Sequence, residues 1–110
     1  MFEEAANEET VETGWGNVAS YDGAPAVIDT LLRLDAETTY TKTELSDEAG
    51  VPLKTLYLDG TLEHLVEIGF LEKHEVEGDE ALFGVATETD VFRAAAAFDE
   101  AVSARLAEEE

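Results

Sequence analysis

The chain contains no cysteine among its 110 residues. This absence excludes disulfide bonds, thiolate redox chemistry and the zinc sites that are built mainly from cysteine. No apolar run approaches the roughly 20 residues that a helix needs to cross a bilayer. The first residues also lack the basic and apolar segments of a secretory signal. We therefore predict a cytoplasmic protein that does not associate with membranes.

Basic residues are scarce: six Lys and Arg stand against 27 Asp and Glu, which gives a formal net charge of −21. In dilute buffer this charge opposes compaction and repels other polyanions. At 1 M salt the Debye length falls to about 3 Å, so most of the repulsion disappears. Hydrophobic residues nevertheless make up 45% of the chain, enough to build a core. Acidic residues spread along such a domain predict a protein from an extreme halophile, with an ordinary acidic protein as the alternative.

Signatures of enzymes are also missing, because the chain has no glycine-rich phosphate loop, nucleophile elbow or paired-histidine metal motif. The many carboxylates cannot be interpreted as acid–base pairs, since acidity is the background of this sequence. A metal site that combines His64, Glu67 and His74 is conceivable, but structural or solvent-exposed roles are expected for both histidines. We therefore predict no enzymatic activity, no cofactor and no metal.

The length corresponds to one domain, for which composition suggests three parts. Residues 1–13 contain five Glu and no basic residue, which predicts a flexible acidic leader. Residues 14–88 are expected to form the folded domain. Residues 89–110 are expected to form a C-terminal helix that serves as a dimerisation element.

Local patterns predict the elements in order. Apolar residues at helical spacing follow Pro25, and this helix is expected to end near Asp35. Thr41 and Glu44 form a capping box that begins a helix over residues 42–49. Further elements are expected as a helix within 52–68, strands near 70–76 and 82–85, and a last helix from residue 89 or 90. The fold class is therefore mainly α with a small β-hairpin.

The segment Ala49-Gly50-Val51 gives this order a more specific meaning. Two helices that cross steeply over a tight turn need a small residue, and they need a glycine that can adopt positive φ. Ala49 and Gly50 supply these, and Val51 supplies an apolar plug beneath the turn. The packing faces would come from Leu45 on the first of these helices and from Leu62, Leu65 and Val66 on the second.

The stretch from Thr41 to Glu72 resembles the winged-helix regulators of archaea, akin to the ArsR and MarR groups. The matching residues are Thr-Lys-Thr-Glu-Leu, then Ala-Gly-Val, then Leu-Glu-His-Leu-Val-Glu-Ile-Gly-Phe-Leu-Glu. The resemblance covers about residues 18 to 106. It implies a winged helix-turn-helix with a three-helix core, a two-stranded wing and a long C-terminal helix. It also implies a DNA-binding transcriptional regulator.

Two departures from the family pattern stand out. Two extra residues follow Gly50: either they lengthen the turn, or they lie within the third helix beside Gly60. A continuous helix would align Thr55, Leu58, Leu62 and Leu65 on the core face. The face expected to contact DNA also carries Asp59 and Glu63, which would meet phosphates unfavourably.

The lysines and histidines nevertheless cluster in this region. In a DNA complex Lys42 would neutralise a phosphate, Lys54 would enter the major groove, and Lys73 would flank it from the wing. The predicted DNA-contacting residues are Lys42, Thr43, Lys54, Thr55, Tyr57, Thr61, Lys73 and His74. The alternatives are isolated surface lysines and a tyrosine that anchors the helix.

The last helix carries an apolar stripe with steps of four, three, four and four residues. A domain of this size has little surface to cover so long a helix, so we predict a two-fold homodimer. The predicted interface residues are Val91, Phe92, Ala95, Phe98, Val102 and Leu106. The leading hypothesis is thus a homodimer that binds double-stranded DNA at high salt. The alternative is a protein–protein interaction module that has lost DNA binding, which exposure of Leu53 and Leu56 would favour.

Overall fold

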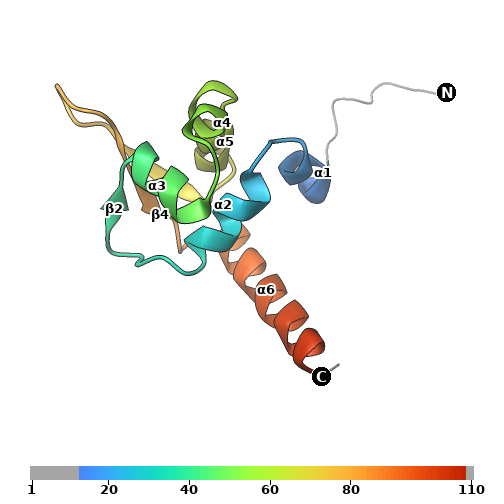
Figure 1. Cartoon of the computed structure of the whole chain (residues 1–110). Coiled ribbons are helices and arrows are strands. Elements are labelled where there is room, and N and C mark those ends of the chain that lie inside the picture. Colours follow the sequence, from blue (N-terminus) through green and yellow to red (C-terminus); the bar gives the residue numbers. More distant parts are fainter. Residues whose placement is uncertain (1–12, 109–110) are drawn as a thin grey trace.

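The computed structural model describes residues 13–108, which form six helices and one three-stranded antiparallel sheet (Figure 1). All but the last residue of the predicted acidic leader lies outside the described residues. The elements are α1 Gly14–Ala19, α2 Ala24–Leu31, β2 Thr39–Tyr40, α3 Lys42–Ala49, α4 Leu53–Leu58, α5 Thr61–Glu67, β3 Leu71–His74, β4 Leu82–Val85 and α6 Asp90–Glu108. No helix in this part of the chain has the length and apolarity to cross a membrane.

The predicted capping box at the start of α3 is confirmed. The Thr41 hydroxyl accepts from the Glu44 N–H at 3.1 Å, and the Glu44 carboxylate accepts from the Thr41 N–H at 2.9 Å. At the other end Gly50 has φ 69°, the left-handed conformation that favours glycine. Val51 is buried directly after it. The chain changes direction here, so α3 and α4 are not one continuous rod (Figure 1).

A continuous third helix is not formed. The segment is divided into α4 and α5 by Asp59 and Gly60, and Gly60 has φ 79°. Leu58, expected on the core face of a continuous helix, is 66% exposed because α4 ends there. The structure starts this segment at Leu53 instead of near Thr55, and at Gly60 it has a break between two helices where the alternative expected extra residues inside one helix.

The sheet has the order β2-β4-β3, with both pairs antiparallel. The predicted hairpin is present, with Leu71 opposite Val85 and His74 opposite Leu82. The short extended piece Thr39–Tyr40 adds a third strand on the other side of β4. This mixed α and β arrangement is compatible with a winged-helix-like fold.

The core lies where α2, α3, α4, α5 and the sheet meet. Its members are apolar side chains that are almost completely buried: Ala24, Val27, Leu31, Leu45, Val51, Leu56, Leu62, Leu65, Phe70, Leu71, Phe83 and Val85. The first helix of this set ends at Leu31 instead of near Asp35. Leu56 is 1% exposed, so the possible exposure of this leucine is contradicted.

A hydroxyl group fixes the start of α6 against this body. Thr89 donates to the Gly69 carbonyl at 2.6 Å and accepts from the Phe92 N–H at 3.1 Å. The same side chain thus caps α6 and fixes its start against the turn between α5 and β3. From there α6 extends away from the body (Figure 1).

Candidate nucleic-acid interface

The helix α4 is unusual in its exposure and in its lack of carboxylates. The ten residues 49–58 are the longest stretch of this acidic sequence without Asp or Glu. Leu56 anchors α4 in the core, while Tyr57 is 62% exposed and Leu53 is 37% exposed. Because Lys54 is exposed as well, α4 presents a surface that is basic and apolar on a protein of net charge −21.

Lys54 differs from most other cations of the chain. Lys42, Lys73, Arg33 and Arg93 each lie in an ion pair with a carboxylate. Within residues 13–108, Lys54 makes no ion pair with another described residue. It is therefore the cation of this region that an external anion can approach without displacing a carboxylate.

Lys42 and Lys73 flank α4 and are each held by a carboxylate. The Lys42 ammonium donates to Glu80 at 3.1 Å and lies 5.3 Å from the centre of the Tyr57 ring. The Lys73 ammonium donates to Glu63 at 2.6 Å. Both lysines line a small hollow of about 150 Å³ together with Tyr57. The structure thus brings Lys42, Tyr57 and Lys73 together. Carboxylates neutralise both of these lysines, whereas Lys54 has no such partner among the described residues.

The surroundings of Lys73 stabilise its charged form. The hydrogen bond to Glu63 raises the pKa of Lys73 above its ordinary value, and the negative charges of Glu63 and Glu75 act in the same direction. Since burial opposes this shift only in part, Lys73 carries its charge throughout the physiological range of pH.

Thr61 does not belong to this surface. It is fully buried, and its hydroxyl donates to the Asp22 carbonyl at 2.9 Å. The prediction that Thr61 contacts DNA is therefore wrong, because its side chain ties α5 to the segment before α2. Of the other predicted residues, Thr43 is exposed at the start of α3, Thr55 is half-buried, and His74 is exposed beside Glu72.

The two histidines lie in different environments. His64 is mostly buried, stacks on the Tyr21 ring at 3.9 Å and is hydrogen-bonded to Asn17. It therefore joins α5 to α1, away from the surface formed by α4. Among residues 13–108 there is no group of three or more side chains that could hold a metal ion.

Leu58, Glu63 and Glu80 contribute to this surface in ways that the sequence reasoning missed. Only a continuous helix would place Leu58 on the core face, and the sequence does not predict that Glu63 and Glu80 pair with the lysines. The acid-free stretch 49–58 was the available signal for the exposed face of α4. The ion pair between Lys42 and Glu80 joins residues 38 apart, so no local signal indicates it.

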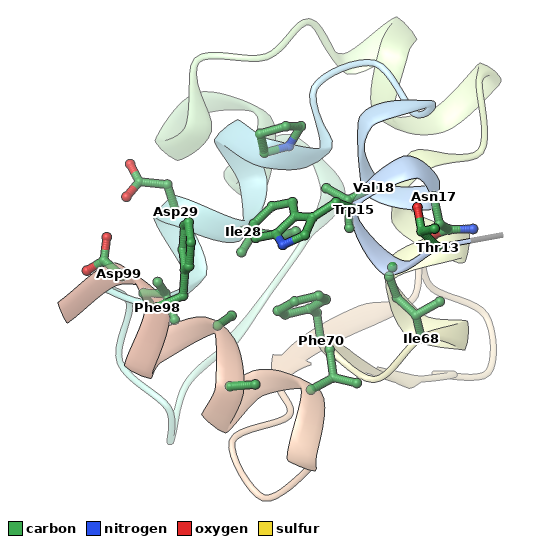
Figure 2. Close-up of a pocket in the computed structure, with 16 residues that line it drawn as sticks. Thr13, Trp15, Asn17, Val18, Ile28, Asp29, Ile68, Phe70, Phe98 and Asp99 are labelled. Carbon is green, nitrogen blue, oxygen red and sulfur yellow. The ribbon is translucent and has the colours of Figure 1, made fainter. Parts of the chain in front are cut away.

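A second surface contains the residues that were predicted to form a dimer. On α6 the apolar stripe is mostly exposed, including Phe98 at 52% and Leu106 at 58%, whereas Phe92 and Ala95 are partly buried against the domain. Beside it lies an apolar groove of about 860 Å³ between α1, α2 and α6. Figure 2 shows Trp15, Ile28, Phe70 and Phe98 around this groove, with Asp29 and Asp99 at one edge.

The chain was compared with protein-family models, with curated proteins and with solved structures. None of the three comparisons gives a significant match. The functional assignment therefore depends on the geometry of the two surfaces described above.

Proposed function

We propose that the chain is a winged helix-turn-helix protein that binds double-stranded DNA as a homodimer and regulates transcription. The observation that supports this proposal is the exposed, carboxylate-free face of α4, on which Lys54 lies without an ion pair to another described residue. In the proposed complex α3 and α4 form the helix-turn-helix, and α4 enters the major groove. The hairpin β3–β4 acts as the wing.

The ion pairs of Lys42 and Lys73 give the proposed interface an exchange mechanism. Both ammonium groups lie beside α4, where phosphates would approach, and both are occupied by carboxylates of the same face. A phosphate can replace each carboxylate as the acceptor of a charge-assisted hydrogen bond. Binding then requires Glu63 and Glu80 to move away or to retain a cation.

High salt is part of this proposal, because the net charge of −21 repels DNA at low ionic strength. Raising the salt shortens the Debye length from about 10 Å at 0.1 M to about 3 Å at 1 M. Long-range repulsion is screened, while contacts between Lys54 and a phosphate at close range persist. We therefore expect the protein to come from a halophile. We also expect its affinity for DNA not to fall as steeply with salt concentration as is usual for DNA-binding proteins. In this proposal it is not an enzyme.

The test is binding to a pool of randomised duplex DNA between about 0.2 and about 3 M KCl. We expect retention of DNA at molar salt, and we expect Lys54→Glu to lower the affinity at least about tenfold. Arg93→Glu is the matched control, since it changes the net charge equally at an exposed position on α6. Absence of DNA binding over the whole range, or equal loss in both variants, would contradict the proposal.

A second candidate is a winged-helix interaction module that binds another protein through the same face. It is favoured by the exposure of Leu53, Tyr57 and Leu58, together with the neutralisation of Lys42 and Lys73. Leu58→Lys separates the two candidates. The substitution adds a cation that maintains or strengthens DNA binding, whereas it weakens an apolar contact with a protein.

A further inference from the structure

The last part of α6 is not covered by the other residues that the structure describes. Every residue from 101 to 108 is exposed, and this end of the helix extends away from the body (Figure 1). Val102 and Leu106 nevertheless continue the apolar stripe that begins at Val91. Exposed apolar side chains in a continuous row indicate a contact surface.

The apolar groove lies at the other end of the same helix. Val91, Ala95 and Phe98 line it from α6, and Trp15 lines it from α1. Trp15 is 64% exposed, and its ring centre lies 5.0 Å from that of Phe98. Figure 2 shows the two side chains entering the groove region from α1 and α6. One copy of the chain thus carries both an open apolar groove and a projecting apolar end.

We propose that α6 pairs in antiparallel orientation with α6 of a second copy, so that each projecting end covers the groove of the other. Reversing α6 about the midpoint between Phe98 and Asp99 pairs the apolar residues on both sides of the centre, while Phe98 lies opposite Asp99 of the second copy. In this register Leu106 lies opposite Val91, and Val102 lies opposite Ala95. A two-fold interface requires such reciprocal pairs. The inference rests on the homodimer of the proposed function and adds the orientation, the register and the occupant of the groove.

Charge supports a second copy as this occupant. Two copies of net charge −21 repel each other, so their contact costs least where carboxylates are missing. On α6 the ranges 91–98 and 101–107 contain no Asp or Glu, so Asp99 and Glu100 are the two carboxylates between Val91 and Leu106. The antiparallel register also brings Arg105, which makes no ion pair with another described residue, toward the exposed Asp90 of the second copy.

A parallel pairing of the two α6 helices is less favourable for the charge of Arg105 and for the apolar groove. It would place the two Arg105 side chains next to each other, and like charges in such positions repel. It would also pair Leu106 with Leu106 and leave the groove beside Val91 open to water. The antiparallel arrangement covers both apolar features with one contact.

The absence of native cysteine allows a direct test by cross-linking. Full-length Val91→Cys and Leu106→Cys variants are mixed at molar KCl and oxidised. The two positions are about 22 Å apart along one helix. A disulfide requires Cα atoms within about 7 Å, so any bond between these positions joins two copies. We expect the mixed disulfide between the two variants to exceed either homodisulfide at least about tenfold.

Two further measurements distinguish a wrong register from the absence of a dimer. They are the cross-linking of Phe98→Cys and the molar mass in solution. Position 98 is near the two-fold axis in either orientation, so a disulfide there reports pairing through α6 alone. A dimer that gives Leu106→Cys homodisulfides, or no mixed disulfide, would overturn the antiparallel register but retain the homodimer. A monomeric mass at all concentrations would overturn both. The DNA-binding assay remains a separate measurement of α4.

Discussion

The surfaces of α4 and α6 share one property and differ in another. Both are free of carboxylates over seven residues or more, although about a quarter of the chain is acidic. The surface of α4 carries Lys54 and is flanked by Lys42 and Lys73, whereas the stripe of α6 is apolar from Val91 to Leu106. In the function proposed for so acidic a protein, the segments without carboxylates are the contact surfaces. The neighbouring side chains then indicate whether the partner is an anion or a second copy.

Leu106→Glu is expected to have the largest effect. It changes the surface of α6 and leaves the surface of α4 as it is. A carboxylate placed in the α6 contact would be desolvated opposite Val91, so we expect the dimer dissociation constant to rise more than about 100-fold. Sedimentation at molar KCl measures this change, and circular dichroism verifies the fold. Ser103→Glu is the control, since it adds the same charge beside the stripe and should retain the dimer. Equal dissociation in both variants would attribute the effect to charge alone.

Gly23→Ala tests the support beneath the turn between α3 and α4. Gly23 has φ 80°, and a Cβ atom there would lie 2.7 Å from a methyl group of Val51, the side chain that plugs this turn. We expect a loss of about 3 kcal/mol in the free energy of unfolding, from left-handed backbone strain plus overpacking.

The control is Gly78→Ala, where φ is 77° but no atom lies within 4 Å of the added Cβ. It should cost only about 1 kcal/mol, from the backbone strain alone. Denaturant unfolding of both variants measures the difference. Equal losses would show that Val51 is not tightly packed against Gly23.

Glu63→Gln is expected to have the smallest effect and to act on the surface of α4. Loss of the carboxylate removes the shorter of the two ion pairs of Lys73 and leaves the pair with Glu75 at 3.6 Å, so DNA affinity should rise about two- to fivefold. Glu67→Gln is the control, because it removes the same charge on α5 without contacting a lysine. Unchanged or weaker DNA binding in Glu63→Gln would argue against an exchange of carboxylate for phosphate.

The same variant changes the titration of Lys73. The pKa of this ammonium group is raised above its ordinary value of 10.5 by Glu63, so the ion pair stabilises the fold at pH values below 10.5 at which Glu63 is ionised. This contribution is lost only as the pH rises through the raised pKa. In Glu63→Gln the pKa of Lys73 should fall, which NMR titration of the side chain can follow.

Elements with local signals could be predicted from the sequence. The capping box of Thr41 and Glu44, the left-handed Gly50 and the start of α6 at Thr89 each depend on residues within a few positions of one another. The sequence leaves the break at Gly60 open, because Leu58, Leu62 and Leu65 have spacings that a continuous helix also permits.

Long-range contacts could not be predicted in this way. The burial of Thr61 depends on the Asp22 carbonyl, which is 39 residues away in sequence. The neutralisation of Lys42 depends on Glu80, beyond the turn of the hairpin. The partners and the exposure of the candidate residues therefore became visible only in three dimensions.

The most direct test of the central claim is the affinity of the chain and of Lys54→Glu for duplex DNA, measured by fluorescence anisotropy at about 2 M KCl. We predict a saturable complex with the original chain and a loss of at least about tenfold in the variant, with the molar mass of the dimer unchanged. Equal affinity of the two proteins, or no complex with either, would contradict the assignment of α4 as a DNA-binding helix.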